Sequence, residues 1–157
     1  MAMGGPAEAQ NLISQDAWQG FAMRGTDNKF DRCVLYNRTV AALTASPYDM
    51  LGITRDATGS VGLLVFFGPG LLRRGESQIQ LKLDQRAPVS VAAEVLSDFH
   101  VNVPALDPAT LAALRDAKAV EAAIDGRTIR FELSAVGAVL DRLDACVKTY
   151  GPKTSAK

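Results

Sequence analysis

Residues 129–151 of this chain read IRFELSAVGAVLDRLDACVKTYG, and the spacing of apolar residues changes midway through this stretch. The first six residues alternate between apolar and polar, which predicts a half-buried strand. From Val136 to Tyr150 the apolar residues recur every three or four positions, which predicts one buried stripe of a helix. Gly151 and the proline after it end that helix. We expect the fold to be built around this helix, which carries Cys146 on or beside its buried stripe.

The chain contains two cysteines, Cys33 and Cys146. An even number of widely spaced cysteines is typical of an exported protein with one disulfide. We therefore predict a Cys33–Cys146 bridge between an N-terminal strand and the terminal helix. The alternative is two reduced core cysteines in a cytosolic protein. A cysteine metal site is not indicated, because no C-x-x-C pair or nearby histidine accompanies either residue.

The totals of the sequence predict one globular domain at residues 17–151, between a flexible segment at 1–16 and a flexible tail at 152–157. Its 157 residues are enough for one core, and 48% hydrophobic with 22% charged residues is ordinary globular composition. Lys+Arg and Asp+Glu both number 17, so the basic excess of a nucleic-acid binder is not present. No apolar run approaches the roughly 20 residues of a membrane span, so we do not expect an integral membrane protein.

The N-terminal residues suggest export. Ala7-Glu8-Ala9 before Gln10 resembles the end of a signal-peptide cleavage site, although a complete signal peptide is not present. We expect the mature chain to begin near Gln10 and to be located in the periplasm.

Short alternating segments separated by turn residues predict a mostly β fold. The predicted strands lie at residues 18–24, 30–39, 48–54, 61–67, 77–84, 88–103, 119–124 and 128–134, with an interruption near 96–97. Asp107-Pro108 predicts the start of a short helix, and Asp125-Gly126 predicts a hairpin turn. We expect an antiparallel β-sandwich or partly open barrel of about eight strands, with one short helix and a C-terminal amphipathic helix packed on the sheet.

Several residues and turns along the chain form a familiar pattern: Trp18, Cys33, the strand after Arg55-Asp56, the turns Gly68-Pro69-Gly70 and Arg74-Gly75-Glu76, and Phe131-Glu-Leu-Ser134 leading to Leu143-Asp-Ala-Cys146-Val147. With these residues, the order of elements resembles the invasion-associated locus B family of small exported proteobacterial proteins. The similarity covers most of residues 18–150. Members of that family often carry further cysteines near the entry strand, where this chain has Met23 and Arg24. The resemblance implies a periplasmic, mostly β, non-enzymatic protein, and it supplies no catalytic or cofactor-binding residues.

A candidate metal site lies within residues 94–102. If these residues form one unbroken strand, then Glu94, Asp98, His100 and Asn102 point to the same face. Carboxylate and amide oxygens with one imidazole suit Ca²⁺, Mn²⁺, Zn²⁺ or a larger hard cation. We take Glu94, Asp98 and His100 as the candidate ligands. The alternative is a solvated strand face.

Two further features bear on function. His100 is the only histidine and no G-x-S-x-G motif occurs, so a small hydrolase would depend on His100 as its base. Arg73-Arg74 predicts a hairpin turn, and the alternative is a lip that binds an anion or a partner, formed with the nearby Phe66, Phe67, Leu71 and Leu72.

The sequence therefore favours a periplasmic, non-enzymatic binding or interaction protein of the bacterial envelope, whose partner is an unknown envelope protein or small ligand. A metal-binding accessory protein and a small hydrolase are the alternatives. We predict no catalytic residues and no cofactor other than a metal ion at the candidate ligands.

Overall fold

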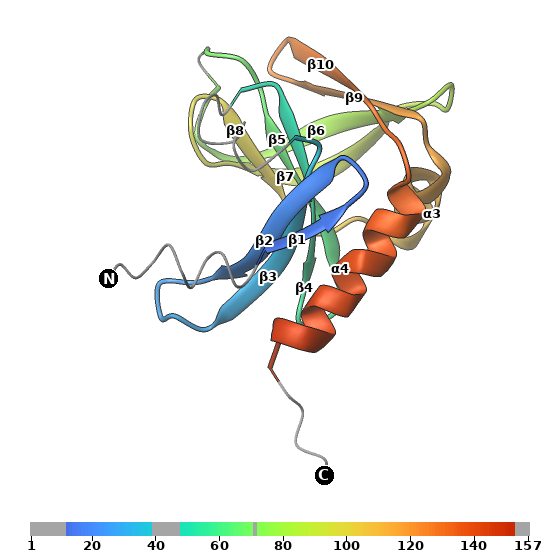
Figure 1. Cartoon of the computed structure of the whole chain (residues 1–157). Coiled ribbons are helices and arrows are strands. Elements are labelled where there is room, and N and C mark those ends of the chain that lie inside the picture. Colours follow the sequence, from blue (N-terminus) through green and yellow to red (C-terminus); the bar gives the residue numbers. More distant parts are fainter. Residues whose placement is uncertain (1–11, 39–47, 71, 153–157) are drawn as a thin grey trace.

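A computed structural model describes residues 12–38, 48–70 and 72–152, which form ten strands and two helices (Figure 1). The strands are β1 (Leu12–Gln15), β2 (Trp18–Arg24), β3 (Phe30–Tyr36), β4 (Met50–Asp56), β5 (Val61–Phe66), β6 (Gly75–Leu83), β7 (Val89–Val95), β8 (His100–Val103), β9 (Ala119–Ile124) and β10 (Arg127–Glu132). The helices are α3 (Pro108–Asp116) and α4 (Val136–Tyr150). The predicted cleavage site at 7–9, most of the predicted flexible segment and nearly all of the predicted tail lie outside the described residues.

All ten strands belong to one sheet, in the order β1-β2-β3-β4-β5-β8-β7-β6-β9-β10, and every neighbouring pair is antiparallel. The mostly β prediction is confirmed. β1 and β10 end the order and are not paired with each other, so the sheet is open.

The predicted number of about eight strands is too low for two reasons. β1 occupies a segment that was expected to be loose, and it is held by pairing with β2 and by burial of Ile13. The predicted strand at 88–103 is two strands, because the chain reverses after β7 and returns as β8. The Leu96 N–H donates to the His100 carbonyl at 2.8 Å, which closes this turn.

The main core lies between one face of the sheet and the helix α4. Trp18, Leu35, Ile53 and Leu81 are among its fully buried side chains. The buried positions of α4 are Val136, Val139, Leu140, Leu143 and Cys146, which confirms the predicted apolar stripe. Figure 1 shows α4 running beside β1 to β4, with α3 near its N-terminal end.

A second apolar cluster covers part of the opposite face of the sheet. We call Val34, Tyr36, Met50, Leu64 and Phe66 the second cluster, against which Phe21, Met23 and Phe99 also pack. Strands β3, β4 and β5 are therefore buried on both faces. β5, which lies within the predicted strand at 61–67, is buried at every position and has a neighbouring strand on each side.

The helix α3 begins as predicted. Asp107 is its N-cap, and its Oδ1 accepts a hydrogen bond from the Thr110 N–H at 2.7 Å, with Pro108 in the first turn. α3 lies beside the end of the β6–β7 hairpin. The space between the helix and the hairpin is the candidate site described below.

Candidate functional site

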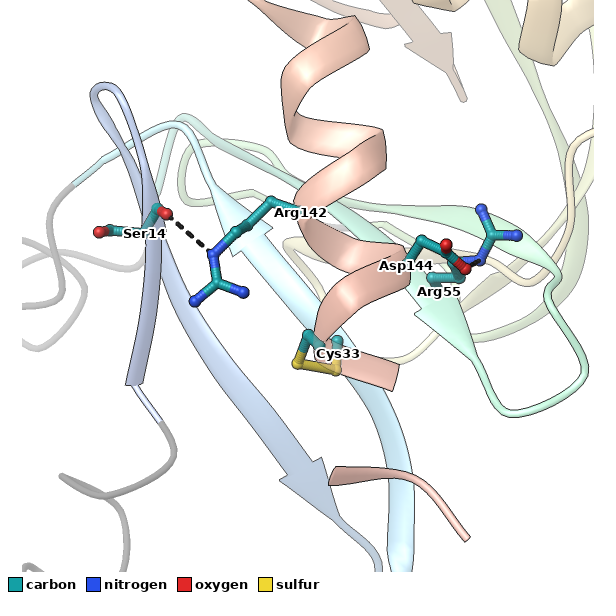
Figure 2. The surroundings of a disulfide bond; sticks show 6 residues. Ser14, Cys33, Arg55, Arg142 and Asp144 are labelled. Atoms are coloured by element: carbon teal, nitrogen blue, oxygen red, sulfur yellow. Dashed lines mark hydrogen bonds and ion pairs between the residues drawn. A yellow bond between two sulfur atoms is a disulfide. The ribbon is translucent and has the colours of Figure 1, made fainter. Parts of the chain in front are cut away.

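Cys33 in β3 and Cys146 in α4 form a disulfide, which confirms the predicted pairing (Figure 2). Their Cα atoms are 6.3 Å apart, and the bridge joins positions separated by 113 residues. Both cysteines are completely buried. The described part of the chain contains no free cysteine. Because both sulfur-bearing residues are buried, the bridge is shielded from solvent and anchors α4 to β3.

Two surface contacts hold α4 on either side of the disulfide (Figure 2). The Arg142 Nε donates a hydrogen bond to the Ser14 carbonyl of β1 at 3.3 Å. Asp144 lies 3.6 Å from the Arg55 Nε of β4, and the Arg55 cation is one cause of the lowered pKa of this carboxyl group, after a hydrogen bond from Lys148. These contacts and the bridge fix α4 to three strands.

The structure does not contain the unbroken strand on which the metal prediction depended. Glu94 lies near the end of β7, Asp98 lies in the turn, and His100 begins β8. Glu94 pairs with Asn102, so Glu94, His100 and Asn102 still share one sheet face, whereas Asp98 lies outside both strands. Among the residues described, no group of three or more His, Cys, Asp or Glu side chains is placed to hold a metal ion. The metal site stays a prediction.

The His100 side chain packs in the second cluster. Its ring stacks on Phe66, with ring centroids 4.1 Å apart and planes tilted by 14°. Its Nε2 is buried and has no hydrogen-bond partner in the described part of the chain. Burial, and secondarily the nearby Arg32 cation, lowers the pKa of His100 from 6.5 to about 4, so the ring is neutral near pH 7.

The Arg73-Arg74 pair lies in the loop between β5 and β6, and both side chains are exposed. These two strands are not neighbours in the sheet, so the predicted hairpin turn is wrong. Phe66, Phe67 and Leu72 beside the pair are buried and offer no exposed apolar surface to a partner, and Leu71 lies outside the described residues. Phe67 is also covered by the Arg127 guanidinium, whose carbon atom lies 5.9 Å from the ring centroid.

A hollow with a mostly apolar lining lies between α3 and the β6–β7 hairpin, and we call it the α3 cleft. Its volume is about 190 Å³. It is lined by Leu81, Leu83, Arg86, Ala87, Val89, Ala109, Thr110 and Ala113. Leu81, Leu83 and Thr110 are buried and form its floor, while Val89 is 39% exposed at its edge. Ala109 and Ala113 leave the space open because their side chains are short.

One positively charged side chain lines the α3 cleft. Arg86 is the only charged residue that lines it, and its side chain is exposed. Within the part of the chain that the structure describes, its guanidinium makes no hydrogen bond or ion pair. An apolar hollow beside an unpaired guanidinium suits a ligand that combines an apolar group with a carboxylate.

A larger hollow of about 450 Å³ lies between the end of α3 and the start of α4. Its lining carries charges of both signs, from Arg115, Asp116, Lys118 and Glu132. Arg115 is also paired with Asp141 on α4 at 3.8 Å. This hollow therefore has less selectivity for one kind of ligand than the α3 cleft.

Sequence reasoning identified α3 but not the cleft. The Asp107-Pro108 signal gave the start of the helix, and the small residues Ala109 and Ala113 are visible at helical spacing. Arg86, however, belongs to a turn that is far from α3 in the sequence. Its role depends on which strands α3 packs against, and the spacing of apolar residues does not contain that information.

No protein-family model matches the chain, and no curated protein matches its sequence. A solved structure is similar in fold, namely invasion associated protein B from Bartonella henselae. The two chains are 18% identical, the match covers 87% of this chain and 98% of the other, and the TM-score is 0.54. The resemblance stated from the sequence is thus confirmed at the level of the fold, which this chain shares with an invasion-associated protein.

Proposed function

We propose that this protein is an exported, non-enzymatic binding protein of the bacterial envelope, which holds part of a partner in the α3 cleft. The observation that carries this proposal is the combination at the cleft of an apolar floor with the unpaired Arg86 guanidinium. A buried apolar floor lowers the free energy of a complex by removing apolar ligand surface from water. An unpaired charge at the rim selects the partner by its opposite charge.

Two observations support an exported location, for which we propose the periplasm. Disulfides persist in oxidising compartments and are rare in the cytosol, so the buried Cys33–Cys146 bridge favours export. The fold also resembles that of an invasion-associated protein. Among the described residues, no helix has the length and apolar content to cross a membrane.

We further propose that residues 17–151 act as one domain, since one sheet and one main core include most of them.

Site-specific photo-crosslinking in the native cells tests the proposed function. A photo-reactive amino acid is placed at Ala109, which lines the α3 cleft and is exposed. Thr128, an exposed residue of β10, is the matched control. We expect a discrete adduct from position 109 in the envelope fraction and none from position 128. Equal labelling at both positions, or no adduct at 109, would show that the cleft is not a binding site.

A further inference from the structure

Strand β7 is paired along its whole length on one side only. On one side its residues from Val89 to Val95 pair with β6. On the other side only Glu94 and Val95 pair with β8. The segment from Val89 to Ala93 therefore has an open edge in the middle of the sheet, among the residues that the structure describes.

The backbone hydrogen bonds of the neighbouring strands show which peptide groups point to that open edge. The Leu96 N–H bonds to His100, so the even-numbered residues of β7 direct their N–H and C=O groups away from β6. The pairing of β6 gives the same result. The Asp84 N–H donates to the Ala119 carbonyl, so even-numbered residues of β6 direct their peptide groups to β9 and odd-numbered residues direct theirs to β7. Ser90 and Ala92 thus direct their backbone donors and acceptors to the open edge.

The chain beyond β8 cannot fill this gap. Continuing the register from the Glu94–Asn102 pair places Pro104 opposite Ala92, and proline has no N–H to donate. The chain instead follows β5, where the Leu106 N–H bonds to the Val61 carbonyl at 2.8 Å. Gly62 permits this close approach, because a Cβ there would collide with the Val103 carbonyl oxygen.

The open edge lacks the protection that the two ends of the sheet have. Charged side chains usually prevent an edge strand from pairing with other chains. β10 carries Arg130 in ion pairs with Glu121 and Glu132. β1 is contacted by Arg142 from α4. On the open segment of β7, by contrast, the exposed side chains are Val89, Ser90 and Ala92, and none of them is charged. Ser90 and Ala92 are small and let another backbone approach, and the exposed Glu94 lies in the part of β7 that pairs with β8.

The open edge adjoins the α3 cleft, because Val89 belongs to both. We propose that an extended, acidic segment of a partner protein adds to β7 as an extra strand. It places one aliphatic side chain in the α3 cleft and one carboxylate on Arg86. This inference rests on the proposed function and specifies its partner.

The size and charge of the site favour a protein segment as the occupant. Ligand pockets for whole small molecules usually measure about 300–1,000 Å³, whereas the α3 cleft measures about 190 Å³ and suits a single side chain. In strand addition, backbone hydrogen bonds provide affinity and pockets for alternate side chains provide specificity. The open edge offers the backbone hydrogen bonds, and the α3 cleft offers the pocket for a side chain. The positive charge of Arg86 favours an acidic side chain at the position of the partner segment that lies near the β6–β7 hairpin.

Hydrogen exchange of the free protein, measured by NMR, tests the open edge itself. We expect the amides of Ser90 and Ala92 to exchange quickly, and those of Val91 and Ala93, which face β6, to exchange slowly. Equal protection of all four amides would show that the edge is covered, and would overturn the inference.

Selection from a library of random short peptides on the intact protein tests the partner. We expect the enriched peptides to contain an aliphatic and an acidic residue, and to slow exchange of the Ala92 amide. Ala92→Pro should abolish their binding by removing the edge donor, and Arg86→Gln should weaken it about tenfold. Arg74→Gln, at another exposed arginine, should leave it unchanged.

Three outcomes would overturn strand addition: no enriched peptide, enriched peptides without acidic residues, or binding that leaves Ala92 exchange unaffected. The last readout uses the unmodified protein, so it does not depend on whether Ala92→Pro folds. If decanoate binds in an Arg86-dependent way that Ala92→Pro does not change, the cleft binds small amphipathic acids instead. In that case crosslinking from Ala109 would still succeed, which separates failure of this inference from failure of the proposed function.

Discussion

The His100 imidazole packs against the second cluster, and its protonation makes the stability of the fold depend on pH. Its pKa is lowered to about 4 in the folded protein, so the unfolded chain binds the proton first as the pH falls. The stability that the neutral ring contributes is complete above its ordinary pKa of 6.5 and is lost progressively between pH 6.5 and about 4.

We therefore predict that the melting temperature of the protein falls between pH 6.5 and pH 4, and that it falls less steeply in His100→Gln. Thermal unfolding followed across this range measures the effect. The carboxyl groups of Asp56, Asp107 and Asp144 have lowered pKa values, so their contributions are lost mainly at more acidic pH. Parallel curves for the two proteins would contradict this role of His100.

The metal hypothesis makes a different demand on the same residue. It predicts that a divalent ion raises the melting temperature, that calorimetry detects its binding, and that His100→Ala removes both effects. For Nε2 to reach an ion, the ring must leave its stacked position on Phe66. Stabilisation that persists in His100→Ala would place any ion elsewhere.

Some residue-scale features followed from the sequence and others did not. The even cysteine count, with one cysteine in a predicted strand and the other on a core-facing helix, predicted the bridge between Cys33 and Cys146, whereas the 6.3 Å between their Cα atoms follows only from the fold. The unpaired state of Arg86 was not predictable. It depends on the absence of an acidic side chain nearby in three dimensions, and residues distant in the sequence determine that.

At the scale of elements, α4 holds the sheet through one face only. Leu143 is completely buried, whereas Asp141 is exposed and pairs only with the exposed Arg115. We predict that Leu143→Ala lowers the free energy of unfolding by about 2–5 kcal/mol, because it leaves a cavity. Asp141→Ala should lower it by less than about 0.5 kcal/mol. Denaturant unfolding measures both, and equal losses would mean that α4 packs through a different face.

The interruption near residues 96–97 was predicted, but the reversal of the chain between β7 and β8 was not, for a geometric reason. In this hairpin Glu94 lies opposite Asn102, so even-numbered positions face even-numbered positions. Inward residues therefore stay odd-numbered on both strands, as Val95 and Val101 show, and the alternation continues through the turn. A period of two cannot distinguish such a hairpin from one long strand. β1 was missed because four residues are too few to establish a period.

At the scale of the whole molecule, the order of the strands in the sheet could not be predicted from the spacing of apolar residues. Most neighbouring strands are consecutive in the chain, but β5 pairs with β8 and β6 pairs with β9, and these two pairings set the order of the sheet. Alternation predicts which face of a strand is buried, but it does not predict the strand's partner. The open edge of β7 and the α3 cleft both result from this order, and for that reason the candidate site could not be derived from the sequence of residues 81–113 alone.

The disulfide should contribute substantially to the stability of the whole fold. It closes a loop between residues 113 positions apart, for which the chain-entropy relation gives about 4–5 kcal/mol. We predict that replacing Cys33 and Cys146 together by alanine lowers the free energy of unfolding by about 2–5 kcal/mol. Denaturant unfolding of the oxidised wild type and the double variant measures this. A loss below that range would mean that the bridge adds little to the packing of α4.

The thiol state of the protein in its own cells tests most directly the claim that this is an exported protein anchored by one bridge. Cells are quenched in acid, the protein is denatured without reductant, and an alkylating reagent is added before mass measurement. We predict an unmodified chain, with both Cys33 and Cys146 inaccessible to the reagent until reduction. A chain alkylated at both cysteines would contradict the bridge and the exported location together.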